Sequence, residues 1–224
     1  MIKSKLDFSY KYDQDFAERY HQSREQNLER RIASQLEIRM ARRSHQLAGQ
    51  PKSVLDLPCG TGRFWSLLSE DPDRVLLAGD SSQAMIQTAI HHHPELAPRF
   101  QFYHLDALAI DLPDRSVESI FSMRLLHHIF EVETRLQIYR EFARVSSHTA
   151  CISLRVTGNF HAWRRQYRLR HRNQPGRNRN VLDPRQAEAE FHMAGWKVIG
   201  KVDLLPYHSM WRTYVLALKT STPS

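Results

Sequence analysis

Apolar positions along the chain fall into short continuous runs that are separated by segments with helical spacing. A continuous apolar run of this length is typical of a strand that is buried on both faces of a parallel sheet. Such runs predict strands at residues 54–57, 74–79, 100–104, 117–122 and 149–156. The intervening segments predict helices at residues 82–92 and 133–146. Because strands that alternate with helices form a doubly wound, mostly parallel sheet, the pattern predicts an α/β fold.

The C-terminal part of the chain adds one helix and two strands to this pattern. Asp183 can cap a helix and Pro184 suits the first helical position, which predicts a helix at residues 184–194. Apolar runs at residues 198–205 and 211–218 then predict a terminal pair of strands.

The strongest motif lies in residues 54–64, where the first strand ends in Asp56 and a turn with Gly60 and Gly62 follows. The two glycines let the backbone fold tightly and approach a ligand where a Cβ atom would collide. A dinucleotide fingerprint needs a third glycine at the position of Trp65, and no P-loop lysine follows. The motif therefore predicts a nucleotide-type site at the carboxyl end of the sheet, without a dinucleotide pyrophosphate.

Two further acids follow predicted strands. Asp80 ends the apolar run at residues 75–79, and Asp106 follows the run at residues 100–105. An ionised carboxylate can accept two hydrogen bonds at once, so Asp80 suits a pair of ribose hydroxyls. Asp106 lies where an adenine amino group is expected. Three carboxylates at successive strand tips thus predict an adenosyl ligand.

These motifs resemble those of the class I S-adenosylmethionine-dependent methyltransferases, specifically the type 11 group. The resemblance covers residues 50–155 and, more loosely, residues 184–219. It implies a Rossmann-like fold with seven strands, of which the seventh is antiparallel. It also implies S-adenosylmethionine as cofactor and S-adenosylhomocysteine as product. The cofactor-binding residues that it implies are Tyr20, Asp56, Pro58, Gly60, Thr61, Gly62, Asp80, Ser81, Asp106, Ala107 and Met123.

The chain departs from the family pattern at one position. Pro58 stands where the family usually has glycine. Proline has a fixed φ angle and no N–H group, so residue 58 cannot donate to the cofactor. The loop can still bind the cofactor, because the closest approach falls at Gly60 and Gly62.

The N-terminal region is expected to form helices outside the methyltransferase domain. Apolar residues recur at every fourth position in residues 24–48, which predicts a long helix that serves as a scaffold. Residues 10–22 are rich in aromatic side chains, and the resemblance implies that they form a lid over the ligands. The alternative is simple packing at the sheet edge. We therefore expect a helical lid and scaffold at residues 1–48 and the methyltransferase domain at residues 49–224.

Composition limits the class of protein further. A chain of 224 residues with 41% hydrophobic residues suits a single α/β domain with an additional arm. It has no leader and no apolar stretch that could span a bilayer, which predicts a cytoplasmic protein that can also lie at the inner face of the membrane. Cys59 and Cys151 are expected to be reduced core residues, with a reactive thiol at Cys59 as the alternative. We expect no metal, because the histidines lack zinc-site spacing and residues 91–93 suit an exposed helix end.

The segment after the fourth strand, residues 123–129, is implied by the resemblance to face the transferable methyl group. His127 or His128 could act as a general base if the acceptor arrives protonated. The alternative is that one of them is a hydrogen-bonded packing residue. The segment lacks the Asn/Asp-Pro-Pro-aromatic signature of many amine methylases.

A basic arm at residues 158–180 contains seven arginines and no acidic residue, in a chain with a formal net charge of +8. Phe160, Trp163 and Tyr167 share one face if the start of the arm is helical, whereas residues 173–176 must form a loop. A basic, aromatic-faced segment beside a methyl donor implies an anionic target. The residues expected to bind the acceptor are Trp163, Arg164, Arg165 and Arg168.

Three anionic targets compete for this arm. They are a phosphorylated glycolipid or membrane surface, RNA, and a partner protein with an acidic face. A solvated, mobile lid is a further alternative. A non-nucleic target is favoured because no RNA-binding module is appended, and the whole chain is similar to small methyltransferases associated with lipopolysaccharide-core assembly in Gram-negative bacteria. The sequence thus predicts a methyltransferase for an anionic acceptor, with RNA methylation or non-catalytic assembly of partners as alternatives.

Overall fold

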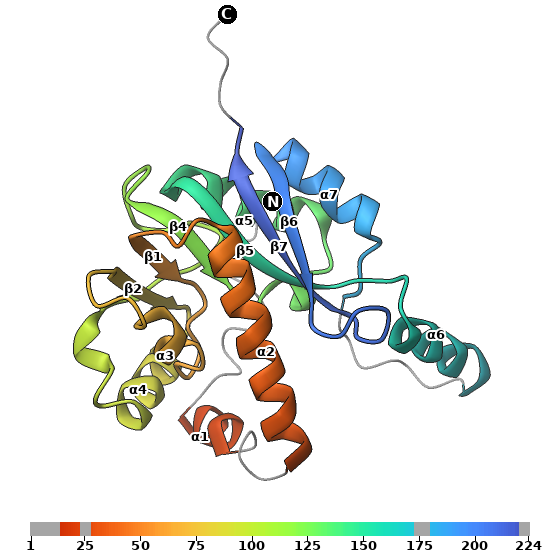
Figure 1. Ribbon diagram of the computed structural model, residues 1–224, viewed down its shortest axis with the longest axis horizontal. Coiled ribbons are helices and arrows are strands. Elements are labelled where there is room, and N and C mark those ends of the chain that lie inside the picture. The colour runs from red at the N-terminus through yellow and green to blue at the C-terminus, as the bar shows by residue number, and fades with distance from the viewer. Residues whose placement is uncertain (1–13, 23–27, 173–179, 220–224) are drawn as a thin grey trace, which may run out of the picture.

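The computed structural model describes residues 14–22, 28–172 and 180–219 (Figure 1). Its seven strands form one sheet in the order β3-β2-β1-β4-β5-β7-β6. The strands are β1 (Ser53–Asp56), β2 (Val75–Asp80), β3 (Phe100–His104), β4 (Val117–Ser122), β5 (Ser146–Arg155), β6 (Trp196–Asp203) and β7 (Trp211–Leu218). Strand β7 pairs antiparallel with β5 and β6, and the other neighbours are parallel. This sheet confirms the predicted seven-stranded α/β fold.

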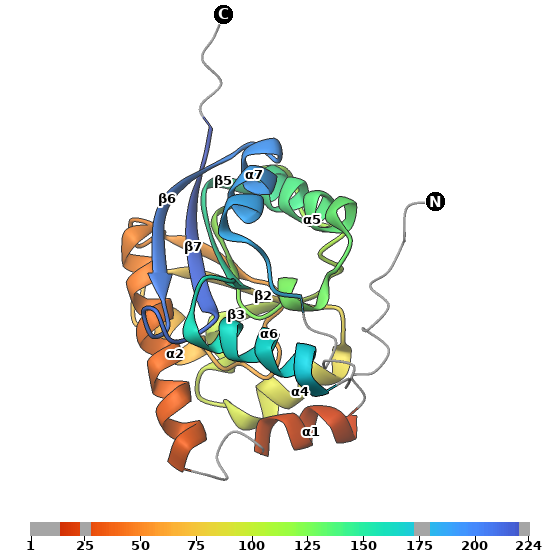
Figure 2. The same cartoon turned by 90° about the vertical axis from the view of Figure 1, so that its right-hand side faces the viewer.

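Helices cover both faces of the sheet (Figures 1 and 2). They are α1 (Gln14–Gln22), α2 (Leu28–Leu47), α3 (Trp65–Leu68), α4 (Gln83–His92), α5 (Val132–Val145), α6 (Phe160–Arg172) and α7 (Pro184–Met193), with 3-10 turns η2 (Ala97–Arg99) and η3 (Leu126–His128). One core cluster joins Leu55 and Ile120 to α5 and α7, and the other joins Val54 and Phe121 to α2, α3 and α4. Successive strand residues point to opposite faces, which explains the continuous apolar runs.

Local sequence signals set several of the helix boundaries. Asp183 caps α7 by accepting a hydrogen bond from the Arg185 amide at 2.8 Å, as predicted. Ser82 caps α4 through the Met85 amide at 3.3 Å. Strand β5 begins at Ser146, earlier than the predicted residue 149, because α5 passes into it without a loop.

The prediction of an exposed helix end at His91, His92 and His93 is wrong for two of the three residues. His92 is half-buried and its Nε2 atom lies 2.9 Å from Glu18 of α1. The His93 ring is also half-buried, and its centroid lies 5.8 Å from that of Trp65. These contacts hold α1 and the glycine turn against the end of α4.

The N-terminal helices lie on the outside of the sheet. Helix α1 packs on α4, and α2 packs along β5, β6 and β7. Ala17 and Ala41 are fully buried in these contacts. The aromatic residues at positions 8, 10 and 12 lie outside the described residues. In the described part of the chain, no helix combines the length and the apolar character needed to cross a bilayer.

Candidate active site

The candidate site lies at the carboxyl ends of the parallel strands. Asp56 ends β1 and Asp80 ends the neighbouring strand β2. Asp106 follows β3, and Met123 follows β4 on the other side of β1. The sheet order therefore brings four of the predicted residues to one edge, at the position where ligands bind in open α/β sheets.

The glycine turn after β1 is fixed to both neighbouring strands. The Leu57 amide donates to the Phe121 carbonyl at 3.0 Å, and the Cys59 amide donates to the Gly79 carbonyl at 2.8 Å. The Gly60 amide donates to Asp80 Oδ2 at 2.9 Å. The peptide bond between residues 57 and 58 is cis. These contacts hold the turn over the tips of β1 and β2.

The two glycines of the turn have different surroundings. Both have positive φ angles, +54° for Gly60 and +73° for Gly62. A Cβ atom on Gly60 would meet nothing within 4 Å, whereas one on Gly62 would lie 2.8 Å from Cδ2 of His93. Gly62 is thus required by packing inside the protein, and Gly60 leaves open space in which a ligand can approach the backbone.

Asp56 is almost completely buried, and neither of its carboxyl oxygens has a hydrogen-bond partner among the described residues. Burial and, to a lesser extent, the nearby carboxyl of Asp80 raise the pKa of Asp56 well above its usual value. The Trp65 indole is close enough to lower this pKa slightly, although it forms no hydrogen bond of normal geometry. A cationic or hydrogen-bond-donating ligand would favour the ionised form.

Asp80 is buried and accepts one hydrogen bond on each oxygen. The donors are the Gly60 amide and, at 2.9 Å to Oδ1, the Ser82 amide. Burial raises the pKa of Asp80 to about 6, although the two amides act in the opposite direction. Each carboxylate oxygen can accept a second hydrogen bond, so the predicted contact with ribose hydroxyls is still available. The neighbouring residue Ser81 is half-buried.

One carboxyl oxygen of Asp106 accepts a hydrogen bond, and the other is buried without a partner among the described residues. Oδ1 accepts a hydrogen bond from the Leu108 amide at 2.9 Å, and Oδ2 has none. The adjacent Ala107 is buried. The orphaned oxygen suits an N–H donor such as an adenine amino group.

The remaining predicted cofactor residues divide into three groups. Thr61 and Met123 are buried beside the turn and at the end of β4, and Pro58 is half-buried. Tyr20 belongs to α1, but its side chain lies outside the described residues.

Cys59 and Cys151 are buried and unbridged, as predicted. Burial raises the pKa of the Cys59 thiol, which argues against the reactive-thiol alternative.

His127 and His128 lie in η3, with their ring centroids 3.9 Å apart. His127 is buried and packs edge-on against Trp211 of β7, at 5.0 Å between the centroids. The guanidinium groups of Arg124 and Arg155 lie 5.0 and 5.7 Å from the centre of the same indole. Trp211 therefore links the end of β4 to β5 and β7, a role that the sequence did not indicate.

A second unpredicted feature joins α2 to the site. Glu37, with a side chain only 7% exposed, binds Arg63 through Oε2 at 2.5 Å and Arg124 through Oε1 at 2.7 Å. Arg63 follows the glycine turn and Arg124 follows Met123. One carboxylate thus connects the loop that follows β1 to the loop that follows β4.

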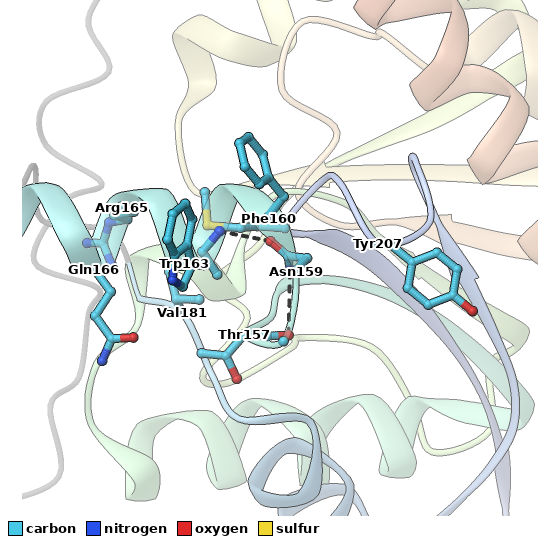
Figure 3. A pocket seen from close by; sticks show the side chains of 11 residues that line it. Thr157, Asn159, Phe160, Trp163, Arg165, Gln166, Val181 and Tyr207 are labelled. Atoms are coloured by element: carbon cyan, nitrogen blue, oxygen red, sulfur yellow. Dashed lines mark hydrogen bonds between the residues drawn. The ribbon is translucent and has the colours of Figure 1, made fainter.

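A groove of about 640 Å³ lies beside the start of α6 (Figure 3). Its lining includes Thr157, Phe160, Trp163, Arg165 and Tyr207, so it combines aromatic walls with a cation. Of the predicted acceptor residues, Trp163 and Arg165 line the groove, and Arg164 is exposed but does not line it. The side chain of Arg168 lies outside the described residues.

The start of α6 is fixed by the loop between β6 and β7, residues 204–210. The amides of Phe160 and His161 donate to the carbonyls of Tyr207 and His208 at 2.9 and 3.1 Å. Asn159 caps the helix, because its Oδ1 atom accepts from the Ala162 amide at 2.9 Å. Within the described ranges, no three His, Cys, Asp or Glu residues come together as a metal site would require.

Comparison with known proteins finds one family model that matches part of the chain and many structures with a similar fold. A family model described as a methyltransferase domain matches residues 54–148. No curated protein sequence matches the chain. The structure of magnesium protoporphyrin IX methyltransferase from Synechocystis with bound SAM has a TM-score of 0.67 at 12% identity, over 97% of this chain and 100% of that chain.

Two further structures come from other organisms. A chain of the complex between the Haloferax volcanii Trm112 methyltransferase activator and a putative methyltransferase has a TM-score of 0.62 at 14% identity, over 84% of this chain and 94% of that chain. An S-adenosylmethionine-dependent methyltransferase from Clostridium acetobutylicum has a TM-score of 0.58 at 12% identity, over 75% of this chain and 84% of that chain. Residues 54–148 are therefore similar to a methyltransferase domain, and the chain has the Rossmann-like fold of the S-adenosylmethionine-dependent methyltransferases.

Proposed function

We propose that the protein transfers a methyl group from S-adenosylmethionine to an anionic acceptor. The observation that carries the cofactor assignment is the set of buried carboxyl oxygens without partners among the described residues, at the tips of neighbouring strands: both oxygens of Asp56 and Oδ2 of Asp106. Buried acceptors of this kind need donors, which a bound ligand would provide. S-adenosylmethionine supplies the methyl group on a cationic sulfur, together with an ammonium group and an adenine amino group.

Each carboxylate has a distinct proposed role. Asp56 faces the methionine part of the cofactor, Asp80 accepts from the ribose hydroxyls, and Asp106 accepts from the adenine amino group. The open space at Gly60 admits the cofactor against the backbone. The remaining proposed contacts are made by Tyr20, Pro58, Thr61, Gly62, Ser81, Ala107 and Met123.

The charge of the site supports a cationic ligand. Asp56 and Asp80 are both buried, and the pKa of each is raised, chiefly by burial. Two carboxyls in one low-dielectric site bind a positive group more strongly than a neutral one. The demethylated product lacks the sulfonium charge, so the same carboxyls favour its release.

The acceptor would lie in the groove at α6, with Trp163 and Arg165 as binding residues. Val156, at the end of β5, precedes the groove residue Thr157, and β5 lies next to β4, which leads to Met123. Aromatic walls with a guanidinium group suit an acceptor that has both an apolar part and an anionic group. A phosphorylated glycolipid has this chemistry.

Methyl transfer requires alignment of the acceptor and exclusion of water more than acid–base chemistry. Buried Met123 and half-buried Trp211, the latter held between two arginines, would form the wall that positions the acceptor. A base is needed only if the acceptor is protonated. We assign that role to half-buried His128, and we assign a packing role to buried His127, which contacts Trp211.

Calorimetric titration with S-adenosylmethionine tests the cofactor assignment. We expect 1:1 binding by the native protein and a large loss of affinity in Asp106→Asn, which keeps the shape of the side chain but adds a donor. Absence of binding to both the cofactor and S-adenosylhomocysteine would disprove the proposed function.

Labelled methyl transfer to separated lipid, RNA and protein fractions of a cell extract tests the acceptor. We expect label in the lipid fraction, reduced in Arg165→Gln and Tyr207→Ala. Label in RNA would replace the proposed acceptor by the nucleic-acid alternative. Cofactor binding without label in any fraction would favour a non-catalytic protein. In the same assay, His128→Ala should lose turnover while cofactor affinity is retained.

A further inference from the structure

Helix α6 presents a continuous aromatic stripe to solvent. The side chains of Phe160, Trp163 and Tyr167 are 45%, 61% and 56% exposed. Their ring centroids are 5.9 Å apart between the first two and 6.0 Å apart between the last two. The helix extends away from the sheet at the edge of the molecule (Figure 1). Three adjacent exposed rings on one helix face are unusual for a surface that contacts only water.

The loop between β6 and β7 extends this stripe into a platform. Tyr207 in that loop is 90% exposed. Phe160 stacks on His208 with 5.2 Å between the ring centroids, and the first two amides of α6 donate to the loop. The exposed aromatic groups are therefore held in a fixed arrangement relative to the sheet.

The charge of α6 is strongly positive. Its 13 residues include Arg164, Arg165, Arg168, Arg170 and Arg172 and no acidic residue. Arg164 is exposed and adjoins Trp163 in the sequence. An apolar stripe flanked by cations is the pattern of a helix that lies in the interface of a bilayer, with its rings among the acyl chains and its guanidinium groups among the phosphates.

We propose that α6 and the tip of the loop at Tyr207 form a docking surface for an anionic lipid bilayer. The ring geometry favours a bilayer over single-stranded RNA, because neighbouring rings contact each other at interplanar angles of 32° and 25° and leave no space for a base between them. Anionic lipid headgroups complement the arginines. Docking would place the groove next to lipid-borne molecules, but it requires neither cofactor binding nor methyl transfer.

Two side chains of α6 allow the docking surface to be tested without a change to the lining of the groove. Tyr167 and Arg164 belong to the exposed face of α6, and neither lines the groove. Met193 and Lys197 are matched controls, since both are exposed and lie near the start of β6, at the opposite end of that strand from the loop. The variants Tyr167→Ala and Arg164→Glu can thus be compared with Met193→Ala and Lys197→Glu.

Co-sedimentation of the full chain with vesicles tests the proposal. We expect binding to phosphatidylcholine vesicles that contain about 30% phosphatidylglycerol, little binding to pure phosphatidylcholine, and weaker binding as salt rises from about 50 to about 200 mM. Tyr167→Ala and Arg164→Glu should each lower the affinity at least about fivefold, and the two controls should leave it unchanged. Absence of vesicle binding, equal binding to both vesicle types, or equal losses in the controls would overturn the proposal, as would tight RNA binding without vesicle binding.

Tryptophan fluorescence gives a second measurement. Trp65 and Trp196 are fully buried, so exposed Trp163 is the indole best placed to enter lipid. Vesicles with brominated acyl chains should quench the native protein, and Trp163→Phe should lose most of that quenching. Unchanged quenching in Trp163→Phe would contradict insertion of α6. Calorimetry with S-adenosylmethionine on the same variants keeps the two proposals distinguishable, because a docking-defective variant should retain cofactor affinity.

Discussion

Glu37 in α2 accepts a hydrogen bond from Arg124 at 2.7 Å, between residues that are 87 positions apart in the sequence. The same carboxylate binds Arg63 at 2.5 Å. Arg124 has a φ angle of +64°, and its amide donates to Ser153 Oγ at 2.7 Å. The loop after Met123 is thus fixed by both α2 and β5, and its position depends on one buried acid.

Replacing Glu37 by glutamine should loosen both loops around the proposed cofactor site. Two guanidinium groups would then face a neutral amide, and we expect the free energy of unfolding to fall by about 3 kcal/mol. The affinity for S-adenosylmethionine should fall about tenfold. Urea unfolding and calorimetry measure the two effects. Glu70→Gln is the control, because its ion pair with Arg42 is exposed and should contribute less than about 1 kcal/mol.

The pH dependence of cofactor binding should report on Asp80. Burial raises the pKa of this carboxyl to about 6, and hydrogen bonds from ribose hydroxyls favour its ionised form. The affinity for S-adenosylhomocysteine should therefore be constant above about pH 6 and fall by up to about tenfold for each pH unit below it. Comparison with Asp80→Asn isolates the contribution of Asp80, because Asp56 and the ammonium group of the product are the same in both titrations. Asp80→Asn should bind weakly with no such dependence, and an equally steep profile in that variant would contradict the assignment.

The two glycines of the turn should respond differently to alanine. Both substitutions place a Cβ atom at a positive φ angle, which costs about 1–2 kcal/mol. Gly62→Ala also forces the new atom against His93, so we expect a total loss of about 3 kcal/mol in the free energy of unfolding. Gly60→Ala should lose only the strain, but its cofactor affinity should fall at least about tenfold. Thermal unfolding and calorimetry of the two variants test this difference.

The buried ion pair between Arg135 and Glu190 should affect stability without affecting the site. Their side chains are 1% and 2% exposed, and Nε of Arg135 lies 2.8 Å from Oε2 of Glu190. Glu190→Gln should lower the free energy of unfolding by about 3–5 kcal/mol, because a buried cation loses its counter-charge. Glu188→Gln, which removes a partly exposed pair with Lys201, should cost at most about 1 kcal/mol. Cofactor affinity should be unchanged in both variants.

The sequence was sufficient to predict the sheet and the carboxylates at its edge. Buried parallel strands give continuous apolar runs, and the acids of the proposed site directly follow those runs, as Asp56 and Asp80 do. Topology then brings the strand tips together, so local signals were enough to predict which carboxylates lie together at the proposed site.

The parts that could not be predicted depend on tertiary contacts. Glu37 is one of several charged residues in α2, and no local signal distinguishes the one that turns inward to two arginines. Trp211 looks like any aromatic residue at the start of a strand, although it contacts His127. The histidines at the end of α4 were misjudged because their burial depends on α1 and on Trp65.

Strand β7 lies between β5 and β6 in the sheet, although it follows both of them along the chain. A chain that leaves the ribosome in order presents the strands with the three site carboxylates long before residues 211–218. Until β7 arrives, β6 has no neighbour, and the loop that holds the start of α6 has no anchor on one side. Synthesis therefore completes the half of the molecule that would bind the methyl donor before the half that would bind the acceptor.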